Sequence, residues 1–188
     1  RHTRYWRDWS SDVCSSDLGN TDTGAVEAEV APHARTLQII HSTLIAGVTA
    51  FLVYVIWQGP RYAEDPDAIP LIPLGFAGMS VVLSVAVPPL VRQSGLAALR
   101  GKSPPSVEAL FGQFSAAHIV GMAILESAGF MSAITLMNGA FGAAPRWFLA
   151  VPIVLLVLMV IRFPRVVSVA EWVSTARDEL ALQPRDQA

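Results

Sequence analysis

Four long apolar segments restrict what this sequence can fold into. They cover residues 37–57, 69–91, 114–137 and 147–163, and they carry only two formal charges, Glu126 and Arg162. A helix of about 20 apolar residues crosses the hydrocarbon core of a bilayer. We therefore predict an all-α fold, an integral membrane four-helix bundle whose membrane domain occupies residues 36–165.

The composition excludes other classes of protein. Hydrophobic residues make up 53% and charged residues 15% of the chain, whereas soluble domains carry about 25% charged residues. The formal net charge of -2 provides no basic field for nucleic acid. The expected partners are the lipid bilayer and either a membrane protein or a second copy of the chain, and no nucleic acid.

Residues 1–18 differ from the rest of the sequence. They are polar and rich in serine, and they lack the apolar central stretch of a signal peptide. The run DWSSDVCSSDL, residues 8–18, resembles translated sequencing-adapter read-through, so we interpret residues 1–18 as a non-native tail rather than a disordered native arm. Because the tail contains the only cysteine, Cys14, we expect neither disulfides nor thiolate chemistry in the native part.

Proline and glycine predict where the helices begin and end. Proline lacks an N–H and clashes with the preceding turn, which ends or kinks a helix. We expect the first three spans to end at Gly59-Pro60, Pro88-Pro89 and Asn138-Gly139, a kink at Pro152, and a helix start capped by Ser103.

Basic residues predict the orientation of the spans. Cytoplasmic loops of membrane proteins are enriched in Lys and Arg, which places residues 19–35, the middle loop and residues 166–188 in the cytoplasm of a cell with an inner (plasma) membrane. Residues 166–182 have apolar positions at 3–4 spacing, which predicts an amphipathic helix lying on the membrane or bundle, or docking a partner. Eight basic residues lie on the cytoplasmic side, Arg35, Arg92, Arg100, Lys102, Arg162, Arg165, Arg177 and Arg185, against Arg61 and Arg146.

Glu126 is the one acid within the four spans, about 12 residues from either end of its own. An ionised carboxylate near the bilayer centre is costly, so we expect Glu126 to be neutral or hydrogen-bonded to neighbouring helices. Thr49 is the candidate partner closest in depth, and Ser80 and Ser84 are further candidates. Three roles stay open: an interhelical hydrogen bond that serves assembly, a proton or cation relay, and a contact with a lipid-like molecule or cofactor. The face around Glu126 includes small residues that favour close packing, Ala123, Gly129 and Ala133.

Two histidines form a second candidate site. His41 and His118 each lie about four residues inside the cytoplasmic end of a span, so they share a depth. Such a pair can ligate a haem iron, line a water path toward Glu126, or hydrogen-bond to headgroups and water. No Glu/His pair has the three-residue spacing of a helical metal site, and we expect no metal.

Three short motifs carry a resemblance. TLQIIHSTL opens the first span, AILESAGF surrounds Glu126, and RFPR ends the fourth span. In this arrangement the chain resembles a family of uncharacterised small four-span bacterial membrane proteins without an assigned activity. The resemblance implies the architecture and no role.

The residues present identify no catalytic site, so we expect no enzyme. The leading hypothesis is a non-enzymatic bundle or complex subunit of the inner membrane. The alternatives are a proton-coupled carrier or channel component that uses Glu126, and a haem-binding redox anchor that uses His41 and His118. Apart from that haem, no cofactor is expected.

Overall fold

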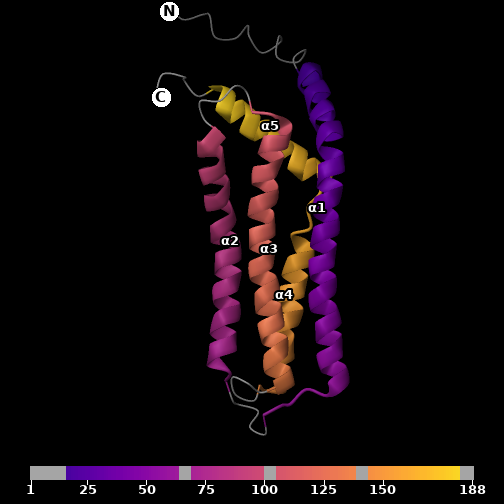
Figure 1. Ribbon diagram of the computed structural model, residues 1–188, viewed down its shortest axis with the longest axis vertical. Coiled ribbons are helices and arrows are strands. Elements are labelled where there is room, and N and C mark those ends of the chain that lie inside the picture. The colour runs from indigo at the N-terminus through magenta and orange to yellow at the C-terminus, as the bar shows by residue number, and fades with distance from the viewer. Residues whose placement is uncertain (1–15, 64–68, 100–104, 139–143, 183–188) are drawn as a thin grey trace, which may run out of the picture.

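The computed structural model describes residues 16–63, 69–99, 105–138 and 144–182 (Figure 1). Within these ranges the protein is all-helical, as predicted, and the only β-type pairing is an isolated bridge between Tyr62 and Ala144. The helices are α1 (Ser16–Gln58), α2 (Leu71–Leu99), α3 (Val107–Asn138), the short 3-10 helix η1 (Arg146–Leu149), α4 (Ala150–Ile161) and α5 (Val166–Leu182).

Three of these helices, α1, α2 and α3, are long and apolar enough to cross a membrane. The fourth predicted span, residues 147–163, corresponds to η1 and α4. Helix α4 has only 12 residues, about 18 Å of helix, and the separately predicted helix over residues 166–182, α5, follows it at a bend of 63°. The number of candidate spans reaches four only when this bent pair is counted as one.

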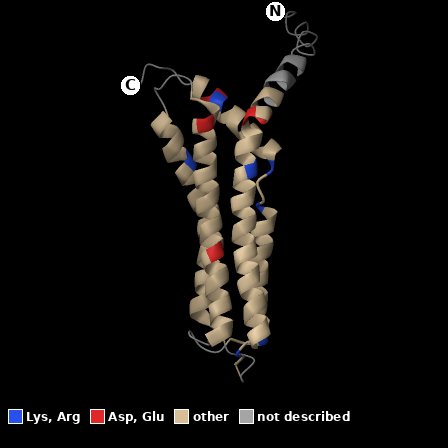
Figure 2. Cartoon of the chain, turned by 45° about the vertical axis from the view of Figure 1, so that its right-hand side comes forward, with Lys and Arg blue, Asp and Glu red and all other residues tan. Residues whose placement is uncertain are grey.

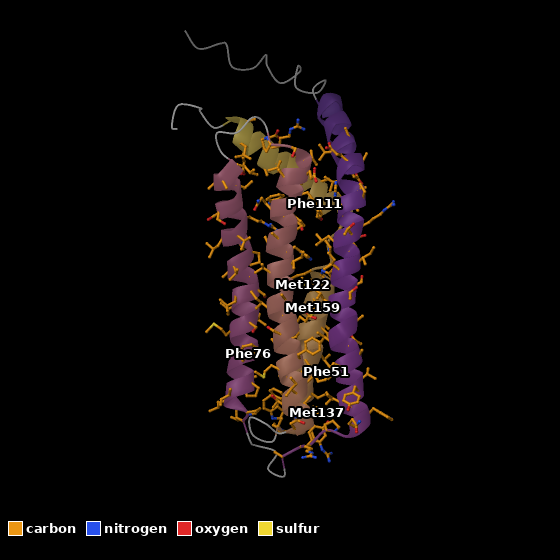
Figure 3. All side chains as sticks on the ribbon, in the orientation of Figure 1. Phe51, Phe76, Phe111, Met122, Met137 and Met159 are labelled. Atoms are coloured by element: carbon orange, nitrogen blue, oxygen red, sulfur yellow. The ribbon has the colours of Figure 1, made fainter. Side chains whose placement is uncertain are left out.

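Helix α3 lies at the centre of the bundle. It contacts α1, α2, α4 and α5, and Figure 1 shows α2 and α1 on either side of it, with α5 lying across one end. Three successive cores fill the space between the helices (Figure 3). The middle core joins four helices through Val48 of α1, Ala77 of α2, Leu125 of α3 and Leu155 of α4.

The core at the α5 end explains the amphipathic pattern of residues 166–182. Val169 and Val173 of α5 are buried against Val30 of α1 and Leu110 of α3. The apolar face of α5 is therefore covered by the bundle, so α5 is neither a free surface helix nor an open docking face. Residues 24–35, predicted only as an N-terminal segment, belong to α1 and supply its side of this core.

The prediction that Pro88-Pro89 ends the second helix is wrong, because α2 continues through both prolines to Leu99. Pro88 cannot donate to the carbonyl of Ser84 four residues earlier. The Arg162 side chain donates to that carbonyl instead, at 3.0 Å. A tertiary contact thus compensates for the missing backbone bond. The Arg162 side chain therefore points into the bundle. From the sequence, Arg162 was expected only as a charge at the membrane surface.

The other helix ends follow local chemistry. Helix α1 ends at Gln58, and Gly59 adopts a positive φ of 83°, a conformation that favours glycine. Helix α3 begins after Ser106, whose hydroxyl accepts a hydrogen bond from the Ala109 amide at 3.2 Å. The predicted cap, Ser103, lies outside the described residues. Pro152 falls in the first turn of α4, where no helical N–H is required.

Candidate functional site

A break between α4 and α5 creates the main polar site of the structure. Pro164 has no N–H to donate to the carbonyl of Val160, and the Phe163 amide donates there instead, at 3.1 Å. The chain then turns into α5. As a result the carbonyl of Met159 loses its usual helical donor, the Phe163 amide. Such end carbonyls need other partners when they are buried.

His41 supplies the partner for Met159. Its Nε2 lies 2.9 Å from the Met159 oxygen, and its Nδ1 lies 2.8 Å from Nε2 of His118. A carbonyl only accepts, so Nε2 of His41 carries a hydrogen. In the neutral ring Nδ1 then accepts, and Nε2 of His118 is the donor of the second bond. His41 is only 1% exposed, and this three-group chain joins α1, α3 and α4.

Two further side chains bind backbone carbonyls around the break. Gln38 of α1 donates through Nε2 to the Pro164 oxygen at 2.9 Å, and Arg162 donates to Ser84 of α2. The break is therefore held from both flanks of the bundle. We define His41, His118, Gln38 and Arg162, with the Met159 and Pro164 carbonyls, as the polar layer.

Aromatic rings surround the polar layer. Phe163 meets His41 edge-on with ring centroids 5.1 Å apart, and Phe114 stacks on His118 at 6.1 Å with an interplanar angle of 8°. Next to them the guanidinium of Arg92 lies 4.6 Å from the Phe114 centroid and 5.3 Å from that of Trp172. These cation–π contacts join the end of α2 to α3 and α5.

The histidine pair does not fit the axial ligation of haem. A metal–imidazole bond of about 2.0 Å on each side separates two axial nitrogens by about 4 Å. Here the facing nitrogens of His41 and His118 are 2.8 Å apart, and the other nitrogen of His41 is bound to Met159. The predicted shared depth of the two histidines is confirmed, but they bind each other, leaving no space for an iron.

Glu126 lies in the seam between α3 and α1. Its Oε1 is 3.9 Å from the position that a Cβ on Gly47 would occupy, and its side chain is only partly buried. Within the described part of the chain, its carboxyl group has no hydrogen-bond partner.

The expected partners of Glu126 point elsewhere. Thr49 is exposed, and its hydroxyl donates to the Ile45 carbonyl of its own helix at 2.8 Å. Ser84 donates likewise to Val81 at 2.7 Å, and Ser80 is buried on α2. Although these hydroxyl groups were predicted at the depth of Glu126, they do not bind its carboxyl group.

The predicted close packing around Glu126 is confirmed at one position. A Cβ on Gly129 would lie 2.9 Å from Cγ1 of Val48, so the backbones of α3 and α1 approach closely there. Ala133 is also buried, whereas Ala123 is exposed. Glu126 therefore sits beside a tight helix contact, at its outward rim.

The arrangement can position helices and share one proton within the histidine pair. No hydrogen-bonded path from the pair to Glu126 exists among the described residues, and no group of three metal-ligating side chains was found there. The sequence analysis did not identify Gln38, Arg92 and Phe163 as residues of this site. The proline of the RFPR motif was the available signal, because a proline after an apolar run leaves helix carbonyls without their backbone donors.

No protein-family model, curated protein or solved structure matches this chain.

Proposed function

We propose that the protein is an integral membrane protein that spans the inner membrane four times, with both ends of the chain in the cytoplasm, and serves as a non-enzymatic subunit or assembly partner in a membrane complex. The segment formed by η1 and α4 would be the fourth crossing, and α5 would lie across its cytoplasmic end.

The outward faces of the helices support membrane insertion. Large apolar side chains point away from the bundle along its length, including Val53 of α1 at 59% exposure, Val82 of α2 at 61% and Val157 of α4 at 50%. Monomeric soluble proteins rarely expose continuous apolar surface of this kind. Figure 2 shows the arginines of the described residues in the part of the bundle nearest α5 and at the opposite end, with more of them near α5. A lipid environment satisfies both features.

Glu126 is the observation that carries the role as a subunit. A polar group in the middle of a bilayer is usually paired or faces a bundle interior. This carboxyl lies at an outward rim without an intrachain partner among the described residues, while His41, Gln38 and Arg162 all bind within the chain. A donor or acceptor from a neighbouring polypeptide would satisfy it.

Two measurements test the proposal in sequence. Alkaline carbonate extraction of membranes tests insertion: the protein should stay in the pellet, and release into the supernatant would refute the membrane assignment. The size of the complex in mild detergent then tests the subunit role. Glu126→Leu should dissociate it, whereas Glu126→Gln, which can still hydrogen-bond, should retain it. Glu108→Gln, at an exposed acid in the first turn of α3, is the matched control. A complex that survives Glu126→Leu unchanged would refute the role.

A proton-coupled carrier or channel component is the second candidate, favoured by the same unpaired carboxyl. It requires that Glu126→Gln abolish a pH-dependent flux in proteoliposomes while leaving the complex intact. The subunit role also requires an intact complex in Glu126→Gln, but with any pH-dependent flux unchanged.

A further inference from the structure

The α4–α5 break leaves a groove on the outside of the bundle. Where α5 turns away, Phe163 of the connection and one stripe of α1 line a shallow, open hollow of about 680 Å³. The stripe follows the 3–4 spacing of a helix face and consists of Arg35, Gln38, Ile39, Ser42, Thr43 and Ala46.

The chemistry of the groove changes along its length. Arg35, exposed and cationic, lies at the end nearest α5, polar side chains follow, and Ala46 lies at the opposite end, toward the middle of the bundle. The eleven helical steps from Arg35 to Ala46 cover about 16 Å. One leaflet of a bilayer contributes about 15 Å of hydrocarbon. The groove thus matches one leaflet in length, with its charge at the water side.

The positive charge at the α5 end of the groove favours an anionic ligand. Of the residues that line the groove, Arg35 is the charged one, and no carboxylate is among them. Arg162 of the connection is bound to Ser84, whereas Arg165 is exposed. The amide of Gln38 is bound to Pro164, so the floor of the groove is fixed in shape.

We infer that this groove is a binding site for one anionic phospholipid, with its phosphate at Arg35 and an acyl chain along Ser42 and Ala46 against Phe163. The inference depends on the proposed membrane location. It gives the α4–α5 break a second role, because the same turn that exposes carbonyls to His41 also opens the groove.

The test uses the full-length protein, delipidated in detergent and offered phosphatidylglycerol or phosphatidylcholine with identical chains. Bound lipid is counted by native mass spectrometry. One basic side chain at a membrane surface favours anionic lipid by on the order of five-fold. The wild type should therefore prefer phosphatidylglycerol by about that factor, and Arg35→Gln should remove the preference. Arg61→Gln, an exposed arginine at the opposite end, should leave it unchanged.

A second pair of variants tests the groove itself. Ala46→Trp, which fills it, should reduce the binding of both lipids, whereas Ala50→Trp, an exposed position of α1 that does not line the groove, should not. Equal binding of the two lipids by the wild type, a preference that survives Arg35→Gln, or full competition by soluble glycerol phosphate would each overturn the inference. A protein that stays soluble without detergent would instead refute the membrane location, so the two failures are distinguishable.

Discussion

Replacing His41 with leucine tests whether the polar layer holds the bundle together. Leucine has a similar volume and keeps the apolar contact with Phe163, so the substitution removes mainly two hydrogen bonds, the one to Met159 and the one to His118. His41 is 1% exposed. Water therefore cannot replace the lost partners without opening the helix packing.

The size of the effect follows from the number of bonds lost. Interhelical hydrogen bonds in membranes contribute about 0.6 kcal/mol on average and at most about 1.7 kcal/mol. Two such bonds, together with a buried carbonyl left unpaired, give a loss of about 1–3 kcal/mol in the free energy of unfolding. His118→Leu breaks only the bond to His41, so it should cost about half as much. The two substitutions together should cost less than their sum, because both remove that shared bond.

The assay is reversible unfolding in mixed detergent micelles, followed by circular dichroism. His33→Leu is the matched control, because His33 lies on the same helix, packs against Phe111 at 5.4 Å and forms none of the hydrogen bonds of the polar layer. Equal losses for His33→Leu and His41→Leu, or strict additivity of His41→Leu with His118→Leu, would refute the structural role of the pair.

Three further predictions use the same unfolding assay. Gly129→Ala should cost about 1–3 kcal/mol, because its Cβ would lie 2.9 Å from Val48, while Gly78→Ala, with nothing within 4 Å, should be neutral or stabilising; equal effects would refute the close contact. Arg162→Met should cost about 1–2 kcal/mol, and less in a Pro88→Ala background, where a new amide N–H reaches the Ser84 carbonyl; an undiminished cost would refute that compensation. Pro164→Ala should reduce the penalty of His41→Leu, because the helix can then continue and pair the Met159 carbonyl itself; an unchanged penalty would contradict this account of the break.

The sequence predicted the elements whose pattern is local. The apolar runs gave the long helices, and the 3–4 spacing of residues 166–182 gave α5 with its buried face. Gly59 marked the end of α1 for the same reason, since its positive φ is a property of one residue.

Features that depend on helix rotation and tertiary partners were not predictable in this way. The depth of Thr49 matches that of Glu126, but depth does not determine the face. The buried residues His41, Val48 and Val55, seven apart, mark the inner face of α1, and Thr49 stands next to that line on the exposed side. The end of α2 was misassigned at Pro88 because the compensating donor, Arg162, lies 78 residues after the Ser84 carbonyl that it pairs.

The length of α1 has a mechanical consequence. At 43 residues it is about 65 Å long, roughly twice the thickness of a bilayer's hydrocarbon, and it takes part in all three cores. Because one helix is packed into the cores at both ends of the bundle, a tilt of the half that contacts α5 would also move the half beside Glu126. In the proposed membrane location, this would link the cytoplasmic end of the protein to the seam between α1 and α3.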